Sequence, residues 1–231
     1  MNEKISIILS TYNEGSIIET TVKEIFSSID NVEIILVDDN SIDGTIDKLN
    51  NINNSNLKIY SRKSRGLASA FLLGVINSNG EYIGWIDANM PQLIKHFKEM
   101  IKQLDNNDFI LLSRYVNGGG DERSKLRVLS SKIINIFCRV ILGNDIKDYT
   151  SGIFLMRRSV LKSGVPIGYG HGEFFIEFLY KLKKNNIKIK EIPYIQPPDL
   201  EGSKTASSIL RFLKLGFIYL IRILIIRFRI N

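Results

Sequence analysis

The sequence predicts an α/β fold in which helices flank a mostly parallel sheet. Short apolar runs alternate with longer segments of helical periodicity, which is typical of a parallel sheet covered by helices. In addition, three of the apolar runs, residues 5–9, 34–37 and 82–86, lead directly into polar residues. In an open α/β sheet, ligands bind in the crevice beyond the carboxyl ends of the strands. We therefore expect these polar residues to meet at one rim and to form a nucleotide and metal site.

Each strand expected in the N-terminal half is a short, mostly apolar run bounded by polar or turn residues. These strands lie at residues 5–9, 32–37, 57–60 and 82–86. The segments between them carry apolar residues at helical spacing, such as Ile18, Val22 and Ile25, so we expect helices there. These helices lie at residues 16–29, between the turn at 41–45 and the asparagine-rich stretch at 50–56, and at residues 66–76.

The C-terminal half continues this alternation up to a cluster of prolines. We expect helices at residues 92–104, 124–142 and 174–184, and strands at residues 109–112, 153–156 and 187–192. The triple glycine at 118–120 predicts a mobile loop that serves either as a lid hinge or as a plain connector. The prolines at 193–198 are expected to end the regular structure of the domain, because proline has no backbone N–H to donate.

Length, composition and charge limit the classes of protein to which the chain belongs. A chain of 231 residues, 44% hydrophobic and 24% charged, is long enough for one domain with an appendage and is not disordered overall. The formal net charge of +7 is compatible with nucleic acid, an anionic membrane or phosphate-bearing substrates. Residues 211–231 hold five basic residues and no acidic one. Because these cations lie on an apolar segment without aromatic platforms, nucleic-acid binding is disfavoured.

The single cysteine, Cys138, excludes an internal disulfide and a cysteine-built metal site. It lies in an apolar segment, so we expect a buried structural thiol. The apolar run near Met1 is too short for a signal peptide, and we therefore expect a cytoplasmic protein.

Residues 205–231 are expected to form an amphipathic helix appended to the domain at residues 1–204. At about 100° per residue, the cations Arg211, Lys214, Arg222 and Arg229 fall within an arc of roughly 80°, and Arg227 lies opposite. The uncharged run at 215–221 is far shorter than the roughly 20 residues that span a bilayer. We expect this helix to lie in a membrane interface with its cations toward anionic headgroups. The alternative is a helix that packs on the domain or on a partner subunit.

Short polar motifs recur along the chain in a recognisable order. They are Ser-Thr-Tyr-Asn-Glu at 10–14, Val-Asp-Asp-Asn-Ser-Ile-Asp-Gly-Thr at 37–45, Arg-Gly-Leu-Ala-Ser-Ala at 65–70, Asp-Ala-Asn at 87–89, Ser-Arg-Tyr at 113–115 and Asp-Tyr-Thr-Ser-Gly at 148–152. Together, over residues 4–204, they resemble glycosyltransferase family 2, and within it the dolichyl-phosphate mannose synthase branch. The resemblance implies a GT-A type fold, a nucleotide-sugar donor, a divalent metal cofactor and a polyprenyl phosphate acceptor reached at the membrane surface.

The resemblance also implies roles for residues at the strand ends. Asp39 would accept the ring N–H of the nucleotide base, although a turn or helix-capping aspartate is the alternative. The residues expected to line the same pocket are Ser10, Tyr12, Glu14, Val37 and Ala88. The family's Asp-x-Asp metal motif corresponds here to Asp87-Ala88-Asn89, so Asp87 and Asn89, with Gln92 as a further candidate, would hold Mg²⁺ or Mn²⁺. Asn89 departs from the family, because an amide oxygen ligates a hard cation without adding a charge.

Three cations match family positions that surround phosphate groups. They are Arg114, Arg127 and Lys204, and guanidinium forks suit phosphate oxygens. With Asp87, Arg114 and Arg127 are the expected catalytic residues. The late family motif Arg-x-x-Gly-x-Ser-Lys survives only as residues 202–204, with Pro-Pro-Asp in place of the arginine. For each cation the alternative is a solvated surface charge. No catalytic base is expected, because a lipid phosphate is already ionised at neutral pH.

We therefore expect inverting transfer of a hexose from a nucleotide sugar, GDP-mannose first and UDP-glucose second, to a polyprenyl phosphate. The protein would attach peripherally to the cytoplasmic membrane face, directly or through a membrane-anchoring partner subunit. Two alternatives stay open. One is a family 2 transferase that acts on a hydroxyl group of a glycan or lipid-linked oligosaccharide and needs a carboxylate base near the acceptor. The other is a non-catalytic homologue that binds a nucleotide sugar or a partner synthase subunit.

Overall fold

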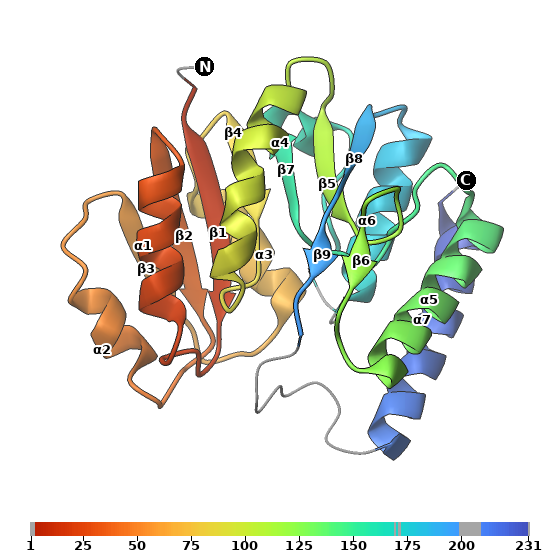
Figure 1. Cartoon of the computed structure of the whole chain (residues 1–231), viewed down its shortest axis with the longest axis horizontal. Coiled ribbons are helices and arrows are strands. Elements are labelled where there is room, and N and C mark those ends of the chain that lie inside the picture. Colours follow the sequence, from red (N-terminus) through yellow and green to blue (C-terminus); the bar gives the residue numbers. More distant parts are fainter. Residues whose placement is uncertain (1–2, 169, 171, 199–208, 231) are drawn as a thin grey trace.

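The computed structural model describes residues 3–168, 170, 172–198 and 209–230, and it describes side chains for these residues except 209–215. The strands of the main sheet are β1 (Ile5–Thr11), β2 (Val32–Asp38), β3 (Leu57–Ser61), β4 (Tyr82–Trp85), β5 (Phe109–Ser113), β7 (Phe154–Arg157) and β8 (Ile189–Pro193). The helices are α1 (Ile18–Ser28), α2 (Thr45–Asn50), α3 (Leu67–Asn77), α4 (Phe97–Gln103), α5 (Lys125–Leu142), α6 (Glu173–Lys184) and α7 (Ile209–Arg229), with 3-10 turns η1 (Pro91–His96) and η2 (Arg158–Lys162). Figure 1 shows helices on both sides of the sheet.

The order of strands in the sheet is β3-β2-β1-β4-β7-β5-β8, and β7 is the one strand of this sheet that runs antiparallel to its neighbours. The predicted mostly parallel α/β sheet is therefore confirmed. The antiparallel direction of β7 has a consequence for function. The chain leaves β5 at the carboxyl edge, passes through α5, and returns to the same edge before β7 begins. Residues 148–152 consequently lie at the rim where β1, β2 and β4 end.

Two apolar cores form, one on each face of the sheet. One core packs α1, η1 and α4 against residues such as Ile7 and Leu36, and the other packs α3, α5 and α6 against residues such as Ile8 and Phe154. Because successive side chains of a strand point to opposite faces, neighbouring residues of β1 supply both cores. Cys138 is fully buried in the second core, as predicted, and burial raises the pKa of its thiol.

Three segments differ from the prediction, and two of them differ because they pair with each other across a long stretch of sequence. The triple glycine is partly a strand, since Gly120 begins β6 (Gly120–Asp121), which pairs with β9 (Ile195–Gln196) in a small parallel sheet. Regular structure therefore continues into the proline cluster, where β9 was not expected. The helix expected at 92–104 begins as the 3-10 turn η1, with Pro91 at its first position.

Glu33 in β2 binds residues near the amino ends of β1, β3 and β4. Its side chain is buried, accepts hydrogen bonds from Ser6 Oγ (2.7 Å) and the Asn79 backbone N–H (2.6 Å), and forms ion pairs with Lys4 (2.8 Å) and Lys58 (3.1 Å). Burial alone would raise the pKa of Glu33, but these four partners outweigh burial and lower the pKa to about 2.

This pKa predicts how stability depends on pH. A carboxyl group with a lower pKa in the folded chain stabilises the fold above its unfolded pKa and loses that contribution as the pH falls toward the folded value. We expect Glu33→Gln to reduce the free energy of unfolding by on the order of 2 kcal/mol at pH 7 and by half of that or less at pH 3, in urea titrations. Exposed Glu99→Gln is the control with no expected effect. An equal cost of Glu33→Gln at both pH values would contradict this account.

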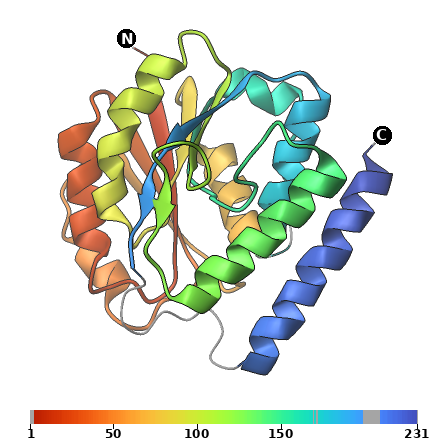
Figure 2. The same ribbon diagram turned by 45° about the vertical axis from the view of Figure 1, so that its right-hand side comes forward.

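The tail forms the predicted helix, and α7 packs on the outside of the domain against α5 and α6 (Figure 2). Arg229 and Arg222 of α7 point toward the buried Glu177 of α6, which also pairs with Lys181 at 3.1 Å. The prediction that the cations of this helix face headgroups is therefore wrong for Arg222 and Arg229. Helical periodicity correctly predicts that these cations share one face of the helix. It does not predict that this face packs against Glu177 of another helix.

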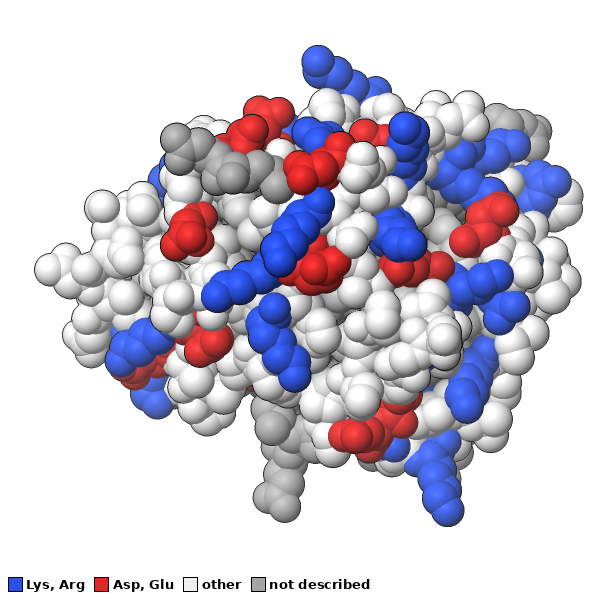
Figure 3. Space-filling model, turned by 45° about the horizontal axis from the view of Figure 1, so that its top comes forward, with Lys and Arg blue, Asp and Glu red and all other residues white. Residues whose placement is uncertain are grey.

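The described residues contain no helix that is long and apolar enough to cross a membrane. The end of the molecule where the strands begin is brought forward in Figure 3, and basic and acidic side chains lie interspersed on that face. This face of the molecule therefore carries both signs of charge.

Candidate functional site

A cavity of about 930 Å³ opens where β1, β2, β4 and β5 end. The residues predicted from sequence that line it are Ser10, Tyr12, Glu14, Asp39, Asp87, Ala88, Asn89, Gln92, Arg114 and Arg127. The expected meeting of polar strand-end residues at one rim is therefore present in the structure.

Two of the predicted residues are not placed in this cavity. Val37 is fully buried within β2 and does not line it. The prediction for its side chain is wrong because Val37 lies inside the sheet, two residues before the rim residue Asp39, where it pairs with Ser10 of β1 and Tyr60 of β3. Lys204 lies outside the described residues.

Asp39 directly follows β2 and is held in place by the segment that follows the neighbouring strand β3. One carboxylate oxygen accepts a hydrogen bond from Arg62 Nε at 2.5 Å, and the other accepts one from the Gly66 backbone N–H at 2.9 Å. Each carboxylate oxygen has two acceptor positions. Asp39 is therefore fixed by these bonds and keeps acceptor capacity for a donor inside the cavity, such as a base N–H.

A stacked pair lies in the same part of the cavity. The Cζ atom of Arg65 is 3.5 Å from the centroid of the Tyr12 ring, and both side chains line the cavity. Such stacking combines cation–π attraction with a flat surface on which a planar group packs well. Sequence analysis placed Arg65 in a motif without giving it a role, because its partner Tyr12 comes from a different strand end.

Asp87, Asn89 and Gln92 follow β4 and offer oxygen atoms to the cavity. The Oδ1 atom of Asn89 is buried and accepts no hydrogen bond from any described residue. A buried acceptor without a donor is costly, and a hard divalent cation would satisfy it. The three residues therefore fit Mg²⁺ or Mn²⁺. Asp87 is the one carboxylate of this donor set, and within the described ranges no three His, Cys, Asp or Glu side chains gather to hold a metal.

We expect Asn89→Asp to bind Mn²⁺ about tenfold more tightly than the unchanged protein, because a second carboxylate adds charge to the site. Isothermal titration calorimetry with Mn²⁺ alone measures this without turnover. The control for added charge is Asn106→Asp, an exposed position beyond the amino ends of the strands, which should leave the affinity unchanged. Equal Mn²⁺ affinities of Asn89→Asp and the unchanged protein would show that residue 89 is not a ligand.

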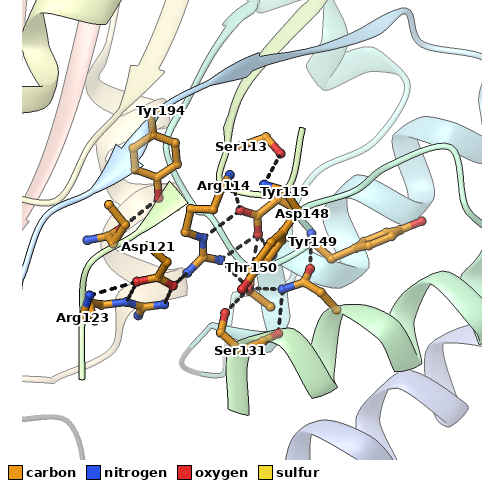
Figure 4. Close-up of polar contacts among 12 residues, drawn as sticks. Ser113, Arg114, Tyr115, Asp121, Arg123, Ser131, Asp148, Tyr149, Thr150 and Tyr194 are labelled. Carbon is orange, nitrogen blue, oxygen red and sulfur yellow. Dashed lines mark hydrogen bonds and ion pairs between the residues drawn. The ribbon is translucent and has the colours of Figure 1, made fainter. Parts of the chain in front are cut away.

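Arg114 lines the cavity from the end of β5, but carboxylates hold its guanidinium group (Figure 4). Its side chain is 3% exposed, and Nε and Nη2 donate to the two oxygens of Asp148 at 2.8 and 2.7 Å. Its Nη1 atom lies 3.6 Å from an oxygen of Asp121. Burial alone would lower the pKa of Arg114, but the charge of Asp148 outweighs burial and raises it. Arg114 is therefore always charged, and it fixes the segment that contains Asp148.

The same network fixes α5 to the rim. Thr150 Oγ1 accepts hydrogen bonds from Arg114 Nη2 and from Asn135 Nδ2, both at 2.7 Å. Asn135 lies in the middle of α5, and its Oδ1 accepts a bond from the Tyr149 backbone N–H at 2.7 Å. Because α5 is anchored in this way, Arg127, about two turns earlier in the helix, has a defined position at the cavity.

Arg123 is a cavity residue that sequence analysis missed. It precedes α5, lines the cavity beside Arg127, and binds both oxygens of Asp121, with Nε at 2.9 Å and Nη2 at 2.7 Å. Its only sequence signal was its place in a short basic segment after the triple glycine. The bidentate bond to Asp121 holds this guanidinium in one orientation, which a surface arginine lacks.

Carboxylates line one side of the cavity and arginines line the other, with the exception of Arg65, which is stacked on Tyr12 on the carboxylate side. The acidic side chains among its described lining residues are Glu14, Asp39 and Asp87, and all three follow β1, β2 or β4. The opposite side, at the ends of β5 and the start of α5, carries Arg114, Arg123 and Arg127 and, in the described part of the chain, no carboxylate that lines the cavity. The aromatic side chains that line the cavity include Trp85 of β4, Phe174 and Phe175 of α6, and Tyr219 of α7.

Comparison with known proteins places the chain among relatives of similar sequence. A family model described as "Glycosyl transferase family 2" matches residues 6–164. A dolichol-phosphate mannosyltransferase of Pyrococcus furiosus is 36% identical over 208 residues, which are 83% of this chain and 56% of that protein. The match therefore spans little more than half of the length of that relative. A polyprenol monophosphomannose synthase of Mycolicibacterium smegmatis is 28% identical over 81% of this chain and 75% of that protein.

Solved structures show the same fold at lower identity. A glucosyl-3-phosphoglycerate synthase of Mycobacterium tuberculosis, in complex with Mn²⁺, uridine diphosphate and glucosyl-3-phosphoglycerate, superposes with a TM-score of 0.72 at 18% identity. The superposition covers 99% of this chain and 81% of that one. The expected GT-A type α/β fold is therefore confirmed.

Proposed function

This chain belongs to glycosyl transferase family 2, and from this premise we propose that it transfers a hexose from a nucleotide sugar to a polyprenyl phosphate. GDP-mannose is the first donor to test and UDP-glucose the second. The relatives named as dolichol-phosphate mannosyltransferases and as a polyprenol monophosphomannose synthase support mannose and a lipid phosphate.

The division of charge in the cavity is the observation that carries this proposal. An acceptor hydroxyl group needs a base to remove its proton, and a carboxylate is a common base. On the side of the cavity opposite Asp39 and Asp87, the described lining residues include Arg123 and Arg127 and no carboxylate. The carboxylates behind this lining, Asp121 and Asp148, are bound by Arg123 and Arg114. This arrangement suits an acceptor that is already an anion, and it disfavours the hydroxyl acceptor that the sequence left open.

In the proposed reaction, an oxygen of the lipid phosphate attacks the anomeric carbon of the sugar. A new carbon–oxygen bond forms as the bond from that carbon to the nucleoside diphosphate breaks, so the diphosphate leaves with the electron pair and the configuration inverts. No proton needs to move, since the attacking phosphate oxygen is ionised. The protein's task is to align the two reacting groups and to offset their repulsion.

Different residues of the cavity would bind the base, the metal ion and the acceptor phosphate. Asp39 would accept a donor of the base while the stacked Arg65 and Tyr12 bound its flat surface. Asp87 and Asn89, with Gln92, would hold a divalent cation, which neutralises charge on the leaving diphosphate. Arg123 and Arg127 would bind the acceptor phosphate, and Arg114 fixes residues 148–152 at the rim through Asp148.

An exposed apolar surface supports attachment to a membrane. The outward side chains of α7 are Phe217, Ile218, Ile221, Leu224, Ile225 and Phe228, and those of the neighbouring α5 are Leu126, Leu129, Ile133, Ile136 and Val140. We call these residues the two-helix apolar face. Lys125, Lys132 and Arg139 recur every seventh residue of α5 and border its apolar stripe. A basic border on an apolar face fits a bilayer with anionic lipids, such as the cytoplasmic leaflet.

We expect Ile133→Glu in α5 and Ile225→Glu in α7 each to weaken binding to anionic vesicles by about tenfold. Each substitution removes apolar area that the bilayer would bury and adds a negative charge that anionic lipids repel. Vesicle sedimentation with the full chain measures this. Ile76→Glu is the matched control, since Ile76 is 78% exposed on α3, away from both helices. Unchanged vesicle binding of both test variants would show that this face does not meet lipid.

The reaction itself is tested by incubating the full chain with vesicles that contain a polyprenyl phosphate and a panel of radiolabelled nucleotide sugars, with and without Mn²⁺ or Mg²⁺. The matched control acceptor is the same polyprenol without its phosphate. We expect metal-dependent label in an acid-labile lipid with the phosphate acceptor and none with the alcohol. Label in the alcohol, or nucleotide binding without product from any donor, would overturn the proposal in favour of a hydroxyl acceptor or a non-catalytic role.

A further inference from the structure

Tyr219 is the residue through which the tail helix reaches the cavity. Among the described side chains of α7 it is the one that lines the cavity, next to Gly172 and Phe174. On a helical projection it lies opposite Phe217 and Ile221 of the two-helix apolar face. One turn of α7 therefore has its outer side at the proposed membrane surface and its inner side at the cavity.

The hydroxyl group of Tyr219 fills the space beside the backbone of Gly172, the residue that precedes α6. A Cβ atom at Gly172 would overlap this oxygen, whereas the next nearest atom, Tyr219 Cζ, would be an ordinary 3.4 Å away. Gly172 has φ of −109°, which other residues also adopt. An alanine at residue 172 would therefore have to displace the tyrosine oxygen, whereas the backbone conformation would accept it.

The hydroxyl group of Tyr219 keeps its proton at neutral pH. Burial raises its pKa, the nearby charge of Glu173 raises it further, and a hydrogen bond with the Gly172 backbone opposes this in part. Tyr219 therefore acts as a hydrogen-bonding and packing group, and it is excluded as a proton acceptor for the reaction.

We propose that Tyr219 is a positioning residue for the lipid acceptor. Its contact with Gly172 links α7 to the first turn of α6 and so fixes the part of the cavity wall where these two helices meet. The same α7 packs against α5, the helix that carries the proposed acceptor-binding Arg127. The inference rests on the proposed transfer to a polyprenyl phosphate. According to this inference, the acceptor binds tightly only when α7 is in place on the bilayer. Binding of the nucleotide, which involves residues after β1, β2 and β3, does not depend on the position of α7.

A double-mutant cycle in the full chain tests this contact. The variants are Gly172→Ala, Tyr219→Phe and the two together, each assayed for the KM of the polyprenyl phosphate in vesicles, the KM of the nucleotide sugar, and the melting temperature. We expect Gly172→Ala to raise the KM of the lipid about tenfold and to leave the KM of the nucleotide sugar within about twofold. Adding Tyr219→Phe removes the overlapping oxygen and should restore most of that loss.

Gly216→Ala is the matched control, because a Cβ at Gly216 of α7 meets no atom within 4 Å. It should leave both KM values unchanged. Additive losses in the double variant, or an equal rise of both KM values, would overturn the inference and leave the transfer reaction standing. If the unchanged protein makes no lipid-linked sugar, the proposed function fails, and this inference fails with it.

Discussion

Replacing Asp87 by asparagine is expected to lower the rate of sugar transfer by on the order of a thousandfold while the fold is retained. Asp87 is the one carboxylate among the three oxygen donors that follow β4, and the other two, Asn89 and Gln92, bring no charge. With Asp87→Asn the site would hold amides alone. A divalent cation would then bind weakly, and the negative charge of the leaving diphosphate would be poorly neutralised.

This expectation is measured with the vesicle assay at saturating nucleotide sugar, together with the melting temperature. Asp105→Asn, an exposed substitution of the same chemistry after α4, is the control and should keep full activity. A second variant, Asp87→Asn with Asn89→Asp, keeps one carboxylate in the set and should recover part of the Mn²⁺ affinity. If Asp87→Asn retains a tenth or more of the rate, the metal role of this residue is refuted.

Replacing Asp148 by asparagine is expected to reduce the free energy of unfolding by about 3–5 kcal/mol. The carboxylate of Asp148 accepts three hydrogen bonds from Arg114, from its backbone N–H, Nε and Nη2, at 2.9, 2.8 and 2.7 Å. Both side chains are almost completely buried. Without Asp148, the guanidinium charge of Arg114 would remain buried without its main partner. An uncompensated buried charge is strongly destabilising.

Urea titration at pH 7 measures this change. The matched control is Asp145→Asn, three residues earlier, where the carboxylate is 72% exposed and pairs with Lys183. A surface pair of this kind contributes little, so we expect a change below about 1 kcal/mol. Similar losses for Asp148→Asn and Asp145→Asn would mean that Asp121 alone is a sufficient partner for Arg114.

Most of the fold was predictable because its elements are encoded locally. The strands β1, β2 and β4 are short apolar runs between turn residues, and α1 and α5 have helical spacing of apolar residues, so each could be found without knowing its neighbours. The pairing of β6 with β9 could not be found in this way. Each strand is two residues long, and it exists because the other lies beside it.

The site was predictable to the extent that it consists of residues at strand ends. Asp39, Asp87 and Asn89 each follow a recognisable strand, and parallel strands bring their carboxyl ends to one edge. Arg123 and Tyr219 were not found, because neither follows a strand of the sheet. Arg123 acquires its position from Asp121, and Tyr219 acquires its position from the packing of α7 against the domain.

The sequence by itself determined the family, the strands and helices, and the polar residues at the rim, because motif and periodicity are properties of neighbouring residues. Only the tertiary structure decided that Arg114 binds Asp148, that Arg222 and Arg229 turn toward Glu177, and that Tyr219 meets Gly172. Periodicity states which side chains share a face of a helix or strand, whereas the choice of which distant segment covers that face depends on packing and charge across the whole chain.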